Sequence, residues 1–246
     1  MTIVIAHDGF SKTVINNSHE DRMSAMEMNV DMIEMDIRLC KSKELVVHHD
    51  WRIEEDLIYQ STLDYLKQKH QLMSLRDVME TYHLYTTNNI KPKLLLDIKT
   101  PHYDVDDKFE LIDKLVNVIH EYIENNVIDY DNIICSSFNK EILSQIYSLD
   151  NKIKLGYITT NLGIDFESLP TNFPIYSVSL YYTEITKDVL NKLNNKGLQV
   201  FLFTVNNIYD MENFIEMKVN GIITDYPDKI FKISNINTTY RKTLLN

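Results

Sequence analysis

Short apolar runs recur along the whole chain and alternate with amphipathic stretches. Nine of these runs, each five to seven residues long, predict strands: 3–7, 32–38, 45–49, 94–99, 132–138, 153–159, 175–180, 200–205 and 221–225. Apolar runs of this length, bounded by polar segments, are typical of buried strands. Between most of them the apolar positions recur at the helical period. The clearest helical stripes are 18–28, 184–196, 207–219 and the set Phe109, Ile112, Leu115, Val116 and Ile119.

Nine strands are one too many for an eightfold barrel. The six residues 39–44 are too few to carry a parallel crossover, so the run 45–49 is expected to fold back on 32–38 as a hairpin. Eight strands then remain, nearly all separated by helix-length segments, and 246 residues suit one (β/α)₈ TIM barrel. A doubly wound parallel sheet is the alternative. No linker or repeat divides the chain, so residues 1–246 are expected to form a single domain.

Composition narrows the possible partners. The formal net charge is −11 and no cluster of Lys or Arg is present, which argues against binding nucleic acid or an anionic membrane through a broad basic face. No apolar run is long enough for a transmembrane segment, and the N-terminal residues lack the pattern of a secretory signal. Cys40 and Cys135 lie inside apolar patterns and are expected to be buried thiols. We therefore expect a soluble cytoplasmic protein, whose oligomeric state the sequence leaves open.

Acidic and basic groups gather at the ends of the predicted strands. His7 follows the first strand, Glu34 and Asp36 lie in the second, and Asp97 and Lys99 end the run 94–99. Residues two apart in a strand share a face, so each of the last two pairs points in one direction. Active sites of such barrels lie at the carboxyl ends of the strands. The sequence therefore predicts a site at this rim.

Glu34, Asp36 and Asp97 would repel one another inside a barrel mouth unless a cation lies between them. A ligand set made only of oxygens suits one hard divalent cation, Mg²⁺ or Ca²⁺, better than zinc. The simpler alternative is that these acids are solvated charges or ion-pair partners of Arg38 and Lys99. The histidines at the same rim favour the metal site.

His7 and His49 are the histidines best placed to exchange protons. Imidazole titrates near neutral pH, so one can serve as acid and the other as base. His48 alternates to the other face and is a weaker candidate, and the remaining histidines are expected to be surface or packing residues (19, 70, 83, 102 and 120). A metal, Lys99 and two histidines together point to phosphoryl chemistry.

Eight short motifs of the chain resemble those of the glycerophosphodiester phosphodiesterase family in order and spacing. They read H-D-G (7–9), I-N-N-S (15–18), N-V-D-M-I-E-M-D-I (29–37), V-V-H-H-D (46–50), D-I-K (97–99), S-S-F-N (136–139), F-T-V-N (203–206) and G-I-I-T-D-Y-P (221–227). The corresponding family pattern is H-R-G, P-E-N-T, G-A-D-x-I-E-x-D-V, V-V-x-H-D, E-I-K, S-S-F, W-T-V-N and G-I-I-T-D-x-P. The match covers nearly the whole chain.

The resemblance implies a TIM-type barrel with one divalent metal and a small phosphodiester as substrate. It implies that His7 and His49 are the acid/base pair. Glu34 and Asp36 match two metal ligands, and Lys99 matches a lysine that contacts phosphate. The larger insertion of some members is expected to be absent, with a loop and a short helix over 51–75.

Other positions depart from the family pattern or complete it. Asp97 stands where the family usually has glutamate, although the related sphingomyelinase D branch has a D-L-K-T segment similar to D-I-K-T here. Phe203 matches an aromatic residue that borders the pocket. Asp8 replaces an arginine that contacts phosphate, and Asn16 stands in place of a glutamate. The double change indicates a rewired site, in which Asp8 remains a candidate substrate contact.

Three functions stay open at this point. The first is a metal-dependent hydrolase that cleaves glycerophosphodiesters to an alcohol and glycerol phosphate by His7/His49 acid–base catalysis. In that case Asp8 would orient a hydroxyl, assist a histidine or meet a cationic head group. The second is a phospholipase D-like enzyme in which a substrate hydroxyl attacks phosphorus and releases a cyclic phosphate. The third is a non-catalytic member that binds a ligand. The retained His7, Glu34, Asp36, His49 and Lys99 favour an enzyme.

Overall fold

Eight parallel strands form a closed ring, because the first strand pairs with both the second and the last. The computed structural model describes residues 1–9, 28–86, 91–100, 105–160 and 169–233. In order around the ring the strands are β1 (Ile3–Ala6), β2 (Met32–Leu39), β6 (Lys93–Ile98), β7 (Ile133–Ser137), β8 (Lys154–Thr159), β9 (Ser177–Tyr181), β10 (Gln199–Phe203) and β11 (Gly221–Thr224). The predicted TIM barrel is confirmed.

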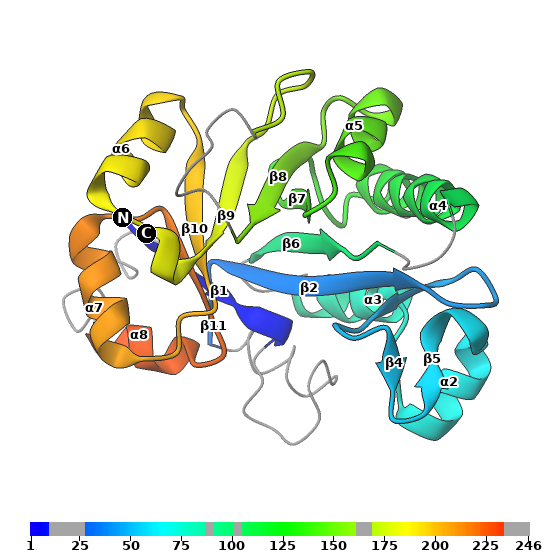
Figure 1. Ribbon diagram of the computed structural model, residues 1–246. Helices are drawn as coiled ribbons and strands as arrows, with labels where there is room; N and C mark the ends of the chain where they lie inside the picture. Colours follow the sequence, from blue (N-terminus) through cyan, green and yellow to red (C-terminus); the bar gives the residue numbers. More distant parts are fainter. Residues whose placement is uncertain (10–27, 87–90, 101–104, 161–168, 234–246) are drawn as a thin grey trace.

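Helices cover the outside of this ring (Figure 1). They are α3 (Leu75–Thr86), α4 (Val105–Glu124), α5 (Lys140–Leu149), α6 (Lys187–Asn195), α7 (Ile208–Met217) and α8 (Pro227–Ile233). Three of them begin where a polar side chain accepts a hydrogen bond from the first turn: Asn139 before α5, Thr186 before α6 and Asn207 before α7. The helix expected over 18–28 lies, except for Met28, outside the described residues.

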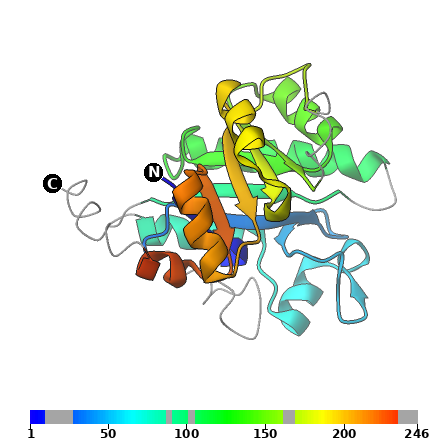
Figure 2. The same ribbon diagram turned by 60° about the vertical axis from the view of Figure 1, so that its left-hand side comes forward.

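The excursion after β2 is also confirmed, and it is more elaborate than predicted. Strand β3 (Leu45–Val47) runs antiparallel to β2 outside the ring. Where a loop and a short helix were expected, the chain forms a small hairpin of β4 (Arg52–Ile53) and β5 (Asp56–Leu57), then α2 (Leu63–His70). Strands of two residues carry no readable periodicity, which is why the pattern missed them. Figure 2 shows this unit projecting from one side of the barrel.

Alternation along the strands divides the core into two layers. The residues that fill the barrel interior are Ile5, Met32, Leu95, Ile134, Phe201 and Ile223. Their neighbours in sequence, such as Ile33 and Leu94, belong to the larger layer between sheet and helices. Strand residues are therefore buried on both faces, which accounts for the continuous apolar runs. Above the inner apolar layer, the same alternation points polar side chains into the barrel mouth.

Two expectations drawn from composition can be compared with the described residues. Cys40 and Cys135 are buried free thiols, as predicted. No helix in the described ranges combines the length and apolar composition needed to cross a bilayer.

Close packing inside the ring depends on Gly221. A Cβ atom at this position would lie 2.7 Å from Phe201 Cδ1 and 3.0 Å from side-chain atoms of Ile3 and Ile5. We expect Gly221→Ala to lower the free energy of unfolding by about 1–3 kcal/mol, because the extra methyl overpacks the interior. Chemical denaturation measures the change. The double variant with Phe201→Leu should lose less than the sum of the two single variants. Strict additivity would show that this contact does not limit the packing.

Candidate active site

Ring closure places Asp36 and Asp97 side by side. They are register partners on the neighbouring parallel strands β2 and β6. Glu34 lies two residues before Asp36 on the same face of β2, and Lys99 follows Asp97 by two residues just beyond β6. Four of the predicted site residues therefore come from one pair of neighbouring strands and from the residue just beyond one of them.

The three carboxylates form a tight, buried group. Oxygen atoms of Glu34, Asp36 and Asp97 lie within 4.8 Å of one another. Their exposed fractions are 5%, 1% and 5%. Asp36 Oδ2 and Asp97 Oδ1 are buried without a hydrogen-bond partner. Buried carboxylate oxygens normally have partners, so these two leave room for a positively charged ligand.

The pKa values of the three carboxyl groups reflect their burial and the negative charges around them. Burial, reinforced by the charge of Asp36, raises the pKa of Glu34 well above its ordinary value. Burial raises the pKa of Asp97 to about 6, although Lys99 opposes the shift. Burial also disfavours the charged form of Asp36, but the positive charge of Lys99 outweighs it, so the pKa of Asp36 is lowered. A cation among these oxygens would favour all three ionised forms.

Lys99 supplies positive charge beside the group. Its Nζ lies 2.8 Å from Asp36 Oδ1 and 2.5 Å from Asp97 Oδ2. Burial works against its charge, but the charges of Asp97, Asp36 and Glu34 raise the pKa of Lys99 above its ordinary value. The ion-pair alternative considered from sequence therefore holds for Lys99. It occupies one oxygen of each aspartate and leaves the other oxygen of each without a partner.

His7 is held by Asp225, a residue that the strand-end analysis missed. His7 Nδ1 lies 2.7 Å from Asp225 Oδ1, and the side-chain amide of Asn206 donates to Asp225 Oδ2 at 2.5 Å. β1 and β11 pair up to Ala6 and Thr224, so the next residues of each strand are neighbours. Asp225 stands in the G-I-I-T-D-Y-P motif. The signal that could have found it is its place at the end of the strand that closes the ring.

Burial alone would lower the pKa of His7. The hydrogen bond to Asp225 and the charges of Glu34 and Asp8 outweigh burial and raise the pKa of His7 to about 10. The side chain keeps 24% of its surface exposed. Asp225 therefore fixes Nδ1 and stabilises the imidazolium, which leaves Nε2 as the nitrogen that can exchange a proton.

Asp8 turns inward and joins the acidic residues. Its exposed fraction is 4%, and its backbone has φ 51° and ψ 28°, in the left-handed region. Its N–H donates to Glu34 Oε2 at 3.2 Å. Its carboxylate lies 3.9 Å from His7 Nδ1, and His7, Asp8 and Glu34 offer atoms within 4.8 Å of one another. The mouth thus holds a fourth buried acid.

His49 acts electrostatically on two of the carboxyl groups, because its positive form lowers the pKa of Asp36 and of Asp97. Its side chain is 55% exposed, and Nδ1 lies 3.0 Å from Asp50 Oδ1. Arg38 reaches the main-chain oxygen of His49 through Nε at 3.0 Å and Nη2 at 2.5 Å. The histidine loop is therefore fixed to β2 by its backbone.

Of the other described histidines, His48 is next to this group, since its main-chain N–H donates to the main-chain oxygen of Asp36 at 3.0 Å. His70 and His120 pair with Asp56 and Asp150 on the outer side of the protein. Burial lowers the pKa of His48. His19 and His102 lie outside the described residues, as does Asn16.

Phe203 belongs to a different part of the mouth. Its ring meets those of Phe138 and Tyr181 edge to face, with centroids 6.3 Å and 6.2 Å apart. The three residues stand at or just beyond the carboxyl ends of β10, β7 and β9, and Phe203 packs on the inner apolar layer. Phe138 and Tyr181 are 46% and 40% exposed. One arc of the mouth is therefore acidic and the opposite arc aromatic.

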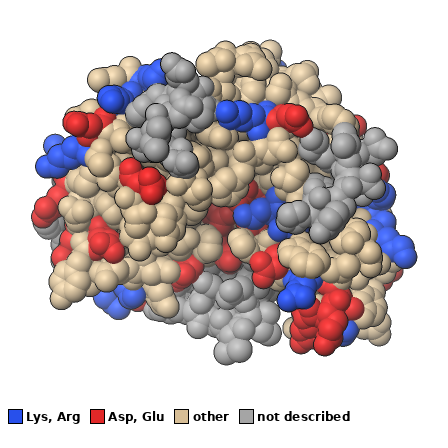
Figure 3. Space-filling view, in the orientation of Figure 1, with Lys and Arg blue, Asp and Glu red and all other residues tan. Residues whose placement is uncertain are grey.

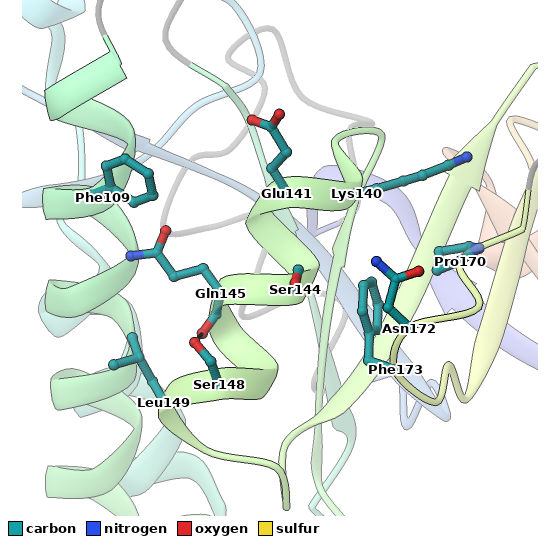
Figure 4. Close-up of a pocket in the computed structure, with 10 residues that line it drawn as sticks. All are labelled: Phe109, Lys140, Glu141, Ser144, Gln145, Ser148, Leu149, Pro170, Asn172 and Phe173. Atoms are coloured by element: carbon teal, nitrogen blue, oxygen red, sulfur yellow. Dashed lines mark hydrogen bonds between the residues drawn. The ribbon is translucent and has the colours of Figure 1, made fainter.

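Acidic and basic atoms lie side by side in a hollow near the centre of the face in Figure 3. A separate pocket of about 540 Å³ lies between α4, α5 and the segment 170–173 (Figure 4). It is lined by Phe109, Lys140, Glu141, Ser144, Gln145, Ser148, Leu149, Pro170, Asn172 and Phe173. None of the predicted site residues lines it, so the candidate active site remains the barrel mouth.

Comparison with known proteins gives one consistent result. The sequence profile described as "Glycerophosphoryl diester phosphodiesterase family" matches residues 7–229. A glycerophosphodiester phosphodiesterase of Caldanaerobacter subterraneus subsp. tengcongensis is 26% identical over 94% of this chain and 97% of the relative. One from Bacillus altitudinis is 25% identical over 95% and 98%.

Solved structures agree in fold. A phosphodiesterase of Oleispira antarctica, in complex with the product sn-glycerol-3-phosphate, superposes with a TM-score of 0.82 at 21% identity. The alignment covers 94% of this chain and 96% of that protein. A glycerophosphodiester phosphodiesterase of Parabacteroides distasonis gives a TM-score of 0.78 at 22% identity, covering 94% and 96%.

The contact between His7 and Asp225 predicts a pH dependence of the metal-free protein. Because the folded state raises the pKa of His7 from 6.5 to about 10, folding takes up a proton between these values. The resulting stabilisation is fully present below about pH 6.5 and is lost as the pH rises through about 10. In Asp225→Asn, we expect the pKa of His7 to fall by at least about one pH unit, because a charge-assisted hydrogen bond is lost.

Histidine NMR of the chelator-treated protein between pH 5 and 11 measures this titration. The matched variant Asp150→Asn changes the outer His120–Asp150 pair, whose atoms lie 2.7 Å apart, and should leave the His7 titration unchanged. An unaltered His7 titration in Asp225→Asn would contradict the role given to Asp225.

Proposed function

Since the chain belongs to the glycerophosphoryl diester phosphodiesterase family, we propose that it is a phosphoric diester hydrolase that cleaves glycerophosphodiesters to an alcohol and glycerol phosphate. The observation that carries this proposal is the convergence of His7, Lys99 and the buried acids Glu34, Asp36 and Asp97 at one rim of the barrel. A phosphodiester needs positive charge at its non-bridging oxygens and proton transfer at the two oxygens that exchange.

We propose that Glu34, Asp36 and Asp97 hold one divalent cation, Mg²⁺ or Ca²⁺. The residues fit such an ion because they offer only oxygen atoms, two of which are buried without a partner. When bound, the cation would offset negative charge on the phosphate oxygens. Lys99, fixed by both aspartates, would stand beside it and contact the phosphate.

His7 and His49 would then divide the proton transfers. Asp225 favours the protonated imidazole of His7, so Nε2 of His7 would donate a proton to the oxygen of the departing alcohol. His49, whose side chain is more exposed than that of His7, would take a proton from the attacking water. The new P–O bond forms to the water oxygen as the P–O bond to the alcohol breaks. The water loses one proton to His49, and the alcohol oxygen gains one proton from His7.

Asp8 and Phe203 are proposed to shape the same mouth. Of the roles considered for Asp8, assistance to a histidine is the one that its burial and its 3.9 Å distance from His7 support. Phe203, with Phe138 and Tyr181, would border the alcohol portion of the substrate. We propose that the substrate is a small molecule and that the protein works in the cytoplasm, where buried free thiols such as Cys40 and Cys135 persist.

Replacing the histidines tests the catalytic assignment. We expect His7→Ala and His49→Ala each to lower kcat by about 10²–10⁴-fold, because a positioned acid or base contributes that much. Phosphorus NMR on a panel of glycerophosphodiesters and lysophospholipids, with Mg²⁺, Ca²⁺ or chelator, follows both rate and product. His120→Ala, on the outer surface, is the matched control and should keep full activity. Full activity in both site variants would overturn the proposal. A cyclic phosphate as the early product would show that a substrate hydroxyl, and not water, attacks phosphorus.

Replacing Asp97 tests the metal site separately from turnover. Asp97→Asn removes one anionic ligand and should weaken cation binding by at least about tenfold, measured by titration calorimetry of the chelator-stripped protein. Asp97→Glu keeps the charge and should bind the cation more tightly than Asp97→Asn does. Circular dichroism checks that each variant is folded. Equal cation affinity in Asp97→Asn and the unaltered protein would place the metal elsewhere.

A further inference from the structure

The barrel mouth is crowded with negative charge, yet the proposed substrate is itself an anion. Asp8, Glu34, Asp36 and Asp97 are all buried there. Lys99 is already bound between two of these acids at 2.5 Å and 2.8 Å. Because Lys99 is already paired with two acids, a phosphate group has few cationic partners here. A second positively charged side chain at the rim would therefore matter for phosphate binding.

Arg38 is such a side chain. It lies on β2 two residues beyond Asp36, hence on the same face as Glu34 and Asp36. This position on β2 places it near the acidic group, and the charges of Asp36, Asp50 and Asp97 favour its ionised form. Burial lowers the pKa of Arg38, but a guanidinium stays charged at neutral pH.

The bonds that Arg38 makes are unusual for a half-buried guanidinium. Its two recorded side-chain hydrogen bonds both go to one acceptor, the main-chain oxygen of His49. Among the residues that the structure describes, no carboxylate lies within ion-pair distance of it. A guanidinium has five N–H donors in a rigid fork, and Nη1 is the arm that these bonds leave unused. Such a fork is suited to hold a protein carbonyl with one edge and a phosphate oxygen with another.

The other described cations near the rim are less suitable. Arg52 stacks over the Trp51 ring at 5.5 Å on the projecting unit. Lys229 donates to Asn206 O at 3.0 Å and lies 3.8 Å from the Tyr226 ring centroid. Both are therefore already engaged by aromatic rings.

We infer that Arg38 is the anion anchor of this mouth: its free edge binds a non-bridging phosphate oxygen while its Nε and Nη2 edge holds the loop of His49. Substrate binding and the position of His49 are thereby linked through one side chain. The inference rests on the proposed phosphodiesterase function, since it presupposes a phosphate group at this site. Arg38 is a substrate-binding and positioning residue, and it exchanges no proton in the reaction.

Binding of a phosphate ligand tests the anchor without relying on turnover. The full-length protein, loaded with Mg²⁺, is titrated with sn-glycerol 3-phosphate by calorimetry. We expect Arg38→Gln to raise the Kd by about 10–100-fold, the range for loss of a charge-assisted hydrogen bond. Arg38→Lys should recover part of the affinity, because it keeps the charge. Arg52→Gln is the matched control for net charge and should leave the Kd unchanged.

Kinetics test the hold on His49. In Arg38→Lys, KM should move back towards the value of the unaltered protein while kcat stays low, because an ammonium group cannot bind the His49 carbonyl with two N–H groups and the phosphate as well. A merely structural role would lower thermal stability without separating KM from kcat. Equal Kd values for the unaltered protein and a folded Arg38→Gln would overturn the inference, and so would an equal loss in Arg52→Gln.

The two proposals can fail independently. If the unaltered protein binds sn-glycerol 3-phosphate through Arg38 but hydrolyses no phosphodiester, the anchor stands and the hydrolase function falls. If it hydrolyses phosphodiesters and Arg38→Gln binds the product as tightly as before, the hydrolase function stands and the anchor falls. No binding of the product by the unaltered protein at millimolar concentration would also overturn the anchor.

Discussion

Mutual repulsion among Glu34, Asp36 and Asp97 is the constraint on which the rest of the site depends. Three carboxylates within 4.8 Å of one another and almost fully buried cannot all be charged unless positive charge stands among them. In a flexible loop they would move apart. Here the parallel pairing of β2 and β6 fixes Asp36 beside Asp97, and the closed ring prevents either strand from yielding. The barrel therefore holds negative charges close together, and the positive charge of Lys99 offsets only part of them.

Asp8 adds negative charge to this group instead of offsetting it. Around the mouth, the five carboxyl groups of Asp8, Glu34, Asp36, Asp97 and Asp225 outnumber the four basic side chains of His7, His49, Lys99 and Arg38. An arginine at position 8, as in the family pattern, would make the net charge of the mouth more positive by two. The presence of an acid there makes the guanidinium of Arg38 and the proposed cation more important for an anionic ligand.

Much of this arrangement could be predicted from sequence because parallel barrel strands are buried on both faces. All eight ring strands lie within two residues of their predicted ends, and the short connector 39–44 identified the hairpin. The rule that residues two apart share a face aligned Glu34 with Asp36, and the rule that barrel sites lie at the carboxyl ends of strands added Asp97 to them. Asp225 was missed because it lies 218 residues from His7, and only the pairing that closes the ring makes them neighbours. Arg38 was considered only as an ion-pair partner, since a bond to a main-chain carbonyl leaves no trace in residue types.

The two histidines each contact an aspartate through Nδ1, but the contact of His7 is much less exposed than that of His49, and this difference fits the proposed division of proton transfers. The carboxylate of Asp225 binds Nδ1 of His7, which favours the imidazolium and leaves Nε2 to exchange a proton. Arg38 binds the backbone of His49, whose ring is exposed and contacts the exposed carboxylate of Asp50. An acid must arrive protonated, so contact with a carboxylate serves it. A base must be able to reach the attacking water, and the exposed ring of His49 allows this.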